Sequence, residues 1–283
     1  MKGHAAKNSR LVIVALDGSP AAATALPLAL AVAEQLGTRV QVLHASAVHI
    51  PEVELRAQLG LDSDELASIE VMLDIGDRPA GSILHATDDQ GIQVVVMTTH
   101  GRTIEPGRQL GRVATEVIAR TTEPVILVRP EAPSSRGPLK RLLLPLDGTP
   151  TTTYALTPAT DLACELGASV DILYVATQPS AATEPGSMGV PQYIDQAHHE
   201  WPSWATEVVD RLYACARMAP EIPVRVFLGQ GDVGSEISRF AQEYKHDAII
   251  LVRRSHLEPD RARILRAVLD STSCPILLVG SPD

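Results

Sequence analysis

A turn with the residues to bind a phosphate group follows an apolar run in the first half of the chain. The run 94–97 (VVVM) is typical of a buried parallel strand, and Thr98, His100 and Gly101 follow it. Nine residues separate Gly101 from Gly111, which precedes a helical pattern. Free N–H groups and the helix dipole favour an anion at a helix start, and glycine lets it approach the backbone. The same spacing also fits a turn that only connects two elements.

The chain repeats itself, which gives this turn a defined place in a domain. Residues 11–20 (LVIVALDGSP) match 141–150 (RLLLPLDGTP). Further matches follow in the same order, namely 36–44 with 166–174, 93–97 with 247–251, and 123–128 with 274–279. The second copy carries an insertion at about 176–204. We therefore predict two domains, 1–132 and 138–283, joined by a linker rich in Pro, Ser and Gly.

The hydrophobic pattern of both copies alternates between strands and helices. The predicted strands of the first copy are 11–16, 40–45, 70–75, 94–97 and 125–128, and its helices are 21–36, 62–69, 79–88 and 111–120. The predicted strands of the second copy are 141–146, 170–175, 223–228, 247–252 and 275–279, and its helices are 151–166, 193–218, 233–244 and 260–272. Ser19 is the predicted N-cap of the first helix, Pro20 its first residue and Gly37 its left-handed cap.

This order predicts the fold class α/β, with two similar, doubly wound domains in tandem, each built on a five-stranded parallel sheet. In such a sheet, ligands bind at the carboxyl ends of the strands, near the point where the strand order reverses. Asp17, Ala45 and residues 98–101 should converge there.

Composition limits the partners and the location. Hydrophobic residues make up 45% of the chain and aromatic residues only 3%, so the core must be built from Ala, Val, Leu and Ile. A net charge of −10 without a basic stripe argues against nucleic acid as a partner. No apolar run approaches the length of a membrane span, and the N-terminus lacks a signal-peptide core. We expect a cytoplasmic protein with no membrane partner.

Other reactive side chains give no sign of a catalytic or metal site. Cys164, Cys215 and Cys274 lack metal-ligand spacing, which predicts buried, reduced thiols. His198 and His199 are adjacent, so they would not share one face of a helix, and we expect no metal site. A Walker A loop, a nucleophile elbow and paired carboxylates are also missing. We therefore predict no catalytic residue, and an enzyme is the least favoured class.

The two halves resemble universal stress proteins over nearly the whole chain. The matching features are a first strand that ends in Asp-Gly-Ser (17–19), Val-Leu-His in the second strand (42–44), the turn 100–102 (HGR), and a last strand that begins at Pro124. The resemblance implies an adenine nucleotide alpha hydrolase-like fold. ATP-binding members carry two glycines spaced G-x2-G, and then x9-G-[S/T], after the fourth strand. The corresponding residues here are Thr98, Gly101, Gly111 and Arg112.

The resemblance implies ATP with Mg²⁺, or another adenine nucleotide, as the ligand of the first domain. Two signature positions depart from the pattern. Thr98 replaces a glycine, and its Cβ narrows the site. Arg112 replaces a residue with a hydroxyl. Arg112 could bind phosphate itself or pair with Glu116 one turn later. The candidate binding residues are Ala15, Leu16, Asp17, Ser19, Ala45, Met97, Thr98, His100, Gly101, Arg102, Gly111, Arg112, Val113 and Ala114.

Individual residues allow a second interpretation. Asp17 by resemblance would accept a hydrogen bond from adenine, or it bonds the N–H groups of its own turn. His100 would contact phosphate, or it stabilises the turn. The second copy has Ser255 and Ala262 at the glycine positions, so we expect no cofactor there. We interpret its arginines as a solvated charged face, with an anion site as the alternative; they are Arg253, Arg254 and Arg263.

Two functions therefore stay open. One is a nucleotide-responsive stress module with at most weak ATP hydrolysis. The other is a stress-protein scaffold that binds no nucleotide and acts through protein partners or another small ligand. In the resembled family the last strands pair across a two-fold axis, which here would join strands 125–128 and 276–279 within one chain. We also expect a homodimer.

Overall fold

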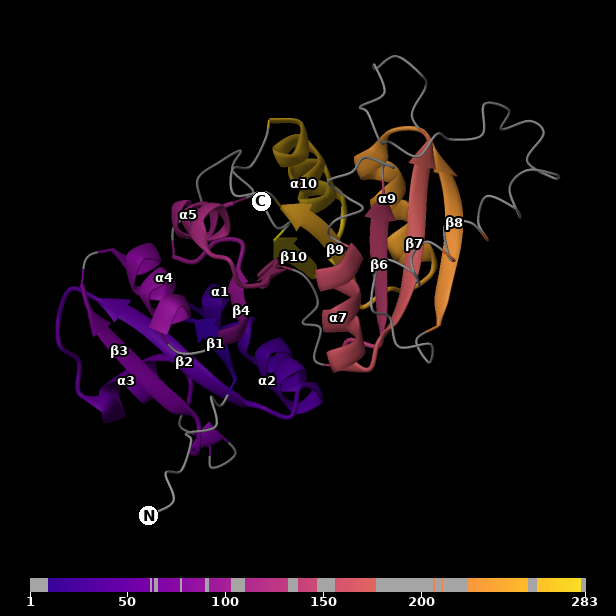
Figure 1. The fold of residues 1–283 in the computed structure, drawn as a ribbon. Helices are drawn as coiled ribbons and strands as arrows, with labels where there is room; N and C mark the ends of the chain where they lie inside the picture. Colours follow the sequence, from indigo (N-terminus) through magenta and orange to yellow (C-terminus); the bar gives the residue numbers. More distant parts are fainter. Residues whose placement is uncertain are drawn as a thin grey trace. The chain divides into compact units, whose positions relative to one another are not determined.

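The structure is a computed structural model that divides the chain into two compact units, unit 1 (Met1–Pro138) and unit 2 (Leu139–Asp283) (Figure 1). It describes residues 10–61, 63, 66–76, 78–89, 92–102, 110–131, 137–146, 156–176, 206, 210, 223–253 and 259–280. Most of the predicted insertion (176–204) and of the helix predicted at 193–218 lies outside these residues. None of the helices that the structure describes has the length and apolar character of a membrane span.

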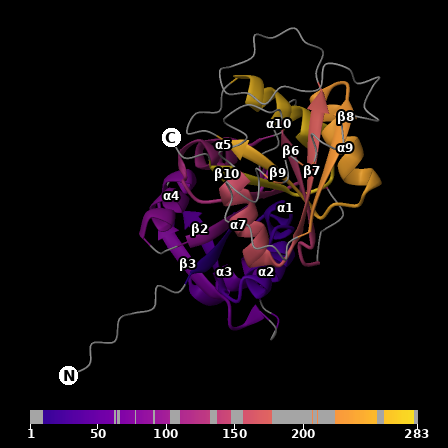
Figure 2. The ribbon, with the colours of Figure 1, turned by 45° about the vertical axis from the view of Figure 1, so that its right-hand side comes forward.

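Unit 1 is an open parallel sheet with helices on both sides. Its strands are β1 (Leu11–Ala15), β2 (Arg39–Ser46), β3 (Glu70–Ile75), β4 (Ile92–Thr98) and β5 (Val125–Val128), and its helices are α1 (Pro20–Ala23), α2 (Leu26–Gln35), α3 (Glu52–Gln58), α4 (Pro79–Asp89) and α5 (Arg112–Arg120). The strand order is β3-β2-β1-β4-β5, with every pair parallel. Helices α4 and α5 lie on one side of the sheet, and α2 and α3 lie on the other (Figures 1 and 2).

Unit 2 repeats this architecture. Its strands are β6 (Arg141–Leu146), β7 (Ser169–Ala176), β8 (Val224–Gln230), β9 (Ala248–Arg253) and β10 (Ile276–Gly280), and its helices are α7 (Leu156–Leu166), α9 (Val233–Glu243) and α10 (Pro259–Ser271). The order β8-β7-β6-β9-β10, again parallel throughout, is the order of unit 1. The predicted fold class, two similar doubly wound domains in tandem, is confirmed.

The turn after β1 has the predicted capping chemistry, but the helix that follows is interrupted. The Oγ of Ser19 accepts a hydrogen bond from Ala22 N at 3.1 Å, Pro20 begins α1, and Gly37 has a φ of +61°. The single helix predicted at 21–36 is wrong, since α1 ends at Ala23 and α2 begins at Leu26. Pro27 has no N–H to donate to the carbonyl of Ala23, so the helical hydrogen bonds stop there.

The segment between β2 and β3 also differs from the prediction. Residues 52–58, which lie outside every predicted helix, form α3. The described part of the helix predicted at 62–69 is a 3₁₀ turn instead, with Ile69 N donating to Leu66 O at 3.1 Å. The guanidinium of Arg56 on α3 donates to the carbonyls of Leu66, Ala67 and Ile69. These bonds satisfy the carbonyls of the turn and tie it to α3.

The central strands of both sheets are buried on both faces. Side chains of β1 at 12–14 and of β6 at 142–144 have no exposed surface, although successive residues of a strand point to opposite faces. Such strands need continuous aliphatic runs rather than alternation, which explains why the runs were recognisable in the sequence. The core is built from Ala, Val, Leu and Ile, as the composition predicts. Polar side chains are therefore concentrated at the ends of the strands.

Candidate functional site

Unit 1 contains a cavity of about 430 Å³ at the carboxyl ends of its central strands. It lies where the strand order reverses, because β2 adds to one side of β1 and β4 adds to the other. This is the position at which open α/β sheets bind ligands. The volume lies within the range of small-molecule sites.

Every predicted binding residue except Ser19 lines this cavity. The lining residues that the prediction included are Ala15, Leu16, Asp17, Ala45, Met97, Thr98, His100, Gly101, Arg102, Gly111, Arg112, Val113 and Ala114. Those that it missed are Ala22, Leu43, Pro79, Ile83 and Thr99. Periodicity could have found two of them, since Leu43 shares a strand face with Ala45 and Ile83 lies one helical turn beyond Pro79. Their part in binding a ligand stays a prediction.

One end of the cavity is apolar and owes its space to small side chains. Ala15 and Ala45 come from the ends of β1 and β2, and Ala114 comes from the first turn of α5. Around them lie Leu43, Ile83 and Met97, which are buried in the core. This end suits a flat, weakly polar ring system, because buried apolar area drives the association.

Asp17 connects the two loops at the polar end. Its Oδ1 accepts hydrogen bonds from Ser19 N at 2.9 Å and Ser19 Oγ at 2.6 Å, and its Oδ2 accepts one from Arg102 N at 2.9 Å. Burial raises the pKa of Asp17, but these hydrogen bonds outweigh burial and leave the pKa below its usual value. The interpretation that Asp17 bonds its own turn is confirmed, and its contact with adenine stays a prediction.

The two glycines of the polar end have different reasons to be glycine. A Cβ at Gly101 would lie 2.1 Å from Oδ2 of Asp17, so a larger residue would displace the carboxylate. Gly111 has a φ of −65°, and a Cβ there would lie 3.4 Å from the carbonyl oxygen of Thr99. The chain therefore tolerates alanine at 111 but not at 101.

His100 stabilises the loop after β4 through both ring nitrogens. Nε2 lies 2.8 Å from Oε1 of Glu131, and Nδ1 lies 3.0 Å from Oγ1 of Thr99. Burial raises the pKa of Glu131, but hydrogen bonds, including that of His100, leave it below its usual value. The turn-stabilising interpretation of His100 is therefore confirmed.

Arg112 is the first residue of α5, and its side chain is exposed at the cavity. The alternative that it pairs with Glu116 is wrong, because Glu116 pairs with Arg120 at 3.0 Å. Arg112 forms no hydrogen bond or ion pair with the residues that the structure describes. Its guanidinium is thus available to a ligand in the cavity.

The corresponding positions of unit 2 carry larger side chains. Val175 matches Ala45, Leu265 matches Ala114, and Arg253 matches Thr99, and all three are buried. Helix α10 begins at Pro259, one turn before the residue that matches Arg112. The interpretation of a solvated charged face is wrong for Arg253, which is only 3% exposed. Asp147, Arg254, Ser255 and residues 256–258 lie outside the described residues, as does the side chain of Ala262.

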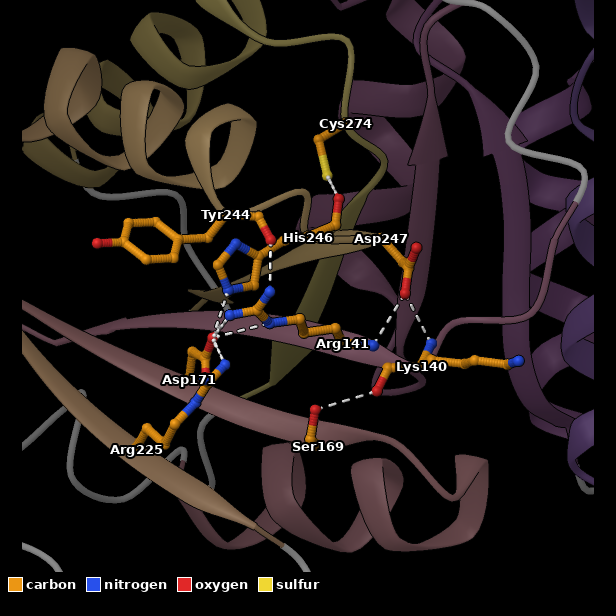
Figure 3. A network of polar contacts seen from close by, with 9 residues as sticks. All are labelled: Lys140, Arg141, Ser169, Asp171, Arg225, Tyr244, His246, Asp247 and Cys274. Carbon is orange, nitrogen blue, oxygen red and sulfur yellow. Dashed lines mark hydrogen bonds and ion pairs between the residues drawn. The ribbon is translucent and has the colours of Figure 1, made fainter.

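A second cluster of ionisable groups lies at the amino ends of the strands of unit 2 (Figure 3). Asp171 of β7 has no exposed surface and accepts hydrogen bonds from Arg141 of β6, Arg225 of β8 and His246, which precedes β9. Burial raises the pKa of Asp171, but the hydrogen bonds from His246, Arg225 and Arg141 lower it to about 2. We call this set of four residues the Asp171 network.

The surroundings of the Asp171 network indicate a structural role. Arg141 also donates to Tyr244 O at 2.6 Å, and Asp247 accepts from the backbone N–H of Lys140 and of Arg141. The thiol of Cys274 donates to His246 O, and burial raises its pKa to about 12, with a contribution from Asp247. Cys164 is also a free thiol, and Cys215 lies outside the described residues. Nowhere in the described part of the chain do three His, Cys, Asp or Glu side chains form a metal-binding group.

The comparisons with known proteins agree with this geometry. The model of the universal stress protein family matches residues 52–129 and 138–280. A comparison with curated protein sequences gives no match.

Three solved structures cover nearly the whole chain. One, assigned to the universal stress proteins of Pseudomonas aeruginosa UCBPP-PA14, is 14% identical with a TM-score of 0.63, and the match covers 96% of this chain and 93% of that chain. A functionally unknown protein from Pseudomonas aeruginosa PAO1 is 13% identical with a TM-score of 0.62, covering 96% and 92%. A universal stress protein from Archaeoglobus fulgidus DSM 4304 is 15% identical with a TM-score of 0.60, covering 97% and 99%.

At these identities the structural likeness shows the fold alone. The family model is the independent finding, because it matches most of the chain in two segments, one in each unit. The chain therefore belongs to the universal stress protein family.

Proposed function

We propose that unit 1 binds an adenine nucleotide and that unit 2 binds none, so that the protein is a nucleotide-responsive stress module. The observation that carries this proposal is the cavity of unit 1, whose lining combines alanines and other apolar side chains with Gly101, Gly111 and Arg112. A nucleotide has the same two-part character, with an apolar base and an anionic phosphate group. No catalytic role is assigned to any lining residue.

The base lies in the apolar end, between the ends of β1 and β2 and helix α4. Asp17 is placed to accept a hydrogen bond from an exocyclic amino group, because Oδ2 has one donor among the described residues, Arg102 N, and a carboxylate oxygen accepts two. The phosphate group lies at the start of α5, where N–H groups have no partner within the helix. Binding would change a surface that partners recognise.

The departure at Thr98 is compatible with this proposal. Thr98 ends β4, and its side chain is buried at 6% exposure. It forms one wall of a cavity that remains open with this side chain in place. The departure at Arg112 replaces a neutral hydroxyl by a cation, which is itself a phosphate ligand.

We further propose domain limits of 1–132 and 138–283, pairing of the two last strands within the chain, a homodimer, and a cytoplasmic location. These follow from the repeat pattern and from the family resemblance. Analytical ultracentrifugation of the full chain checks the oligomeric state, with a mass near twice 30.2 kDa as the expected result.

Titration of ATP into the purified full chain tests the nucleotide proposal, after mass spectrometry of small molecules released from the protein. The variant Gly111→Asp places a carboxylate beside the phosphate position, and we expect it to weaken binding at least about tenfold. Gly111→Ala is the matched control, because it adds the Cβ without the charge and should retain binding. Full binding by Gly111→Asp would show that the nucleotide lies away from the loop that ends at Gly111, and no binding by the wild type would favour the scaffold that acts through protein partners or another small ligand.

A further inference from the structure

We propose that Arg112 takes the place of a divalent cation in unit 1, so that this site binds the phosphate group of its nucleotide without Mg²⁺. This inference rests on the proposed function, whose ligand it describes more closely. It departs from the Mg²⁺ that the family resemblance implies.

The residues at the polar end do not fit Mg²⁺. This ion needs an octahedral shell of oxygen ligands, usually with one or two carboxylates from the protein. Among the described residues that line the cavity, Asp17 is the sole carboxylate; its Oδ1 accepts two hydrogen bonds and its Oδ2 one, and the proposed contact with the base takes the remaining position. A hydroxyl at position 112 could coordinate a cation, whereas a guanidinium donates hydrogen bonds only.

Among the described residues at this end, Arg112 is a cation that no carboxylate compensates. Arg102 lies in the electrostatic field of Asp17, and its backbone N–H donates to the same carboxylate. The ring of His100 contacts the carboxylate of Glu131. Within the described part of unit 1, no carboxylate pairs with Arg112. A phosphate group in the cavity would supply the missing negative charge.

The position of Arg112 suits bidentate contact with phosphate. It follows Gly111, which is the N-cap of α5 and provides no side-chain hydrogen bond to the first turn. The N–H groups of that turn are therefore left for a ligand, and the first helical residue, Arg112, lines the same cavity. A guanidinium and a phosphate form two parallel, charge-assisted hydrogen bonds, which neutralise charge without an ion.

Calorimetric titration of ATP and ADP, each in excess MgCl₂ and in EDTA, tests this proposal on the full chain. We expect the dissociation constant of the wild type to change by less than about threefold between the two buffers. Arg112→Ser restores the hydroxyl of the family pattern, and we expect at least about a tenfold loss of binding in EDTA. Arg120→Ser is the matched control, since it removes the same charge from the same helix at a distance from the cavity. Its dissociation constants in MgCl₂ and in EDTA should equal those of the wild type.

The outcomes separate this proposal from the one on which it rests. Wild-type binding that weakens more than about tenfold in EDTA would overturn the role of Arg112 and leave nucleotide binding intact. Unchanged binding by Arg112→Ser in EDTA would do the same. Absence of binding in both buffers would overturn both proposals. Thermal unfolding of Arg112→Ser at the wild-type temperature shows that a loss of binding is not a loss of fold.

Discussion

Unit 1 has a cavity at the carboxyl ends of its strands, whereas the matching described positions of unit 2 carry larger side chains. Ala45 and Ala114 of unit 1 become Val175 and Leu265, and helix α10 begins a turn earlier than α5. Polar side chains follow the opposite distribution. Unit 2 has the Asp171 network at the amino ends of its strands, where the matching residues of unit 1 are Leu11, Gln41, Glu70 and Ile92. The two copies of the fold thus differ, with a cavity at the carboxyl ends of the strands in unit 1 and a buried ionic cluster at the amino ends in unit 2.

The pair Gln41 and Asp171 shows this difference at one position of the repeat. Both side chains are buried in the second strand of their unit. Asp171 has three basic partners, whereas Oε1 of Gln41 is buried without a hydrogen-bond partner among the described residues. The residue that matches Arg141 in unit 1 is Leu11, so unit 1 has no cation to pair at this point. Substitutions at these positions should therefore have opposite effects.

The largest expected effect is that of Asp171→Ala, which would lower the free energy of unfolding of unit 2 by about 3 kcal/mol. The loss follows because His246, whose side chain is fully buried, and the two arginines would lose their common carboxylate. We place it at the lower end for a broken buried pair, since the side chain of Arg225 is 53% exposed and screened by water. Native-state hydrogen exchange in urea, followed separately in β7 and in β2, measures the effect in each unit.

Acid should remove the same stabilisation in the wild type. The pKa of Asp171 is about 2 in the folded chain, below the value of about 3.9 expected in the unfolded chain. The folded state therefore gains stability above about pH 4 to 5, and this gain is lost as the pH falls towards 2. The difference between wild type and Asp171→Ala should shrink over that window. A constant difference down to pH 2 would contradict the assigned ion pairs.

Filling the cavity of unit 1 should have the next largest effect. Ala114→Leu introduces the side chain that unit 2 carries at Leu265, and we expect nucleotide binding to weaken at least about tenfold. Ala119→Leu, on the same helix but away from the cavity, is the matched control. Calorimetric titration measures binding, and thermal unfolding shows whether the variant remains folded. Tight binding by Ala114→Leu would mean that the ligand lies elsewhere.

Much of the fold follows from the sequence because its strands are buried on both faces. The strands at 125–128 and 141–146 begin and end as predicted, since their aliphatic runs are bounded by polar or breaking residues. The strand at 70–75 also has the predicted bounds, although its side chains are only partly buried. The break in the first helix was missed, although it has a cause in the sequence. Pro27 lacks the N–H group that would donate to the carbonyl of Ala23. The position of α3 is determined by tertiary contacts instead, with Leu55 buried and Arg56 bonding a distant turn.

The candidate site was predictable where its residues carry chemistry and not where they supply shape. Asp17, Gly101 and Gly111 have a recognisable spacing, whereas Leu43 and Ile83 look like any core residues. The Asp171 network went unpredicted because its members are spread over more than a hundred residues and meet only in the folded sheet. One signal was available, namely a carboxylate within the apolar run 170–175, since a buried charge requires partners.

The smallest expected effect separates the two units most directly. Gln41→Met keeps the length of the side chain and removes its unpartnered amide oxygen, so the free energy of unfolding of unit 1 should rise by about 1 kcal/mol. Asp171→Met is the matched change in unit 2, and it should destabilise because His246 and the arginines remain. Hydrogen exchange in β2 and in β7 measures the change in the free energy of unfolding of unit 1 and of unit 2 separately. A loss of stability in Gln41→Met would show that the favourable contacts of the amide outweigh the penalty of burying its unpartnered oxygen. Gln41 would then stabilise unit 1, as Asp171 stabilises unit 2.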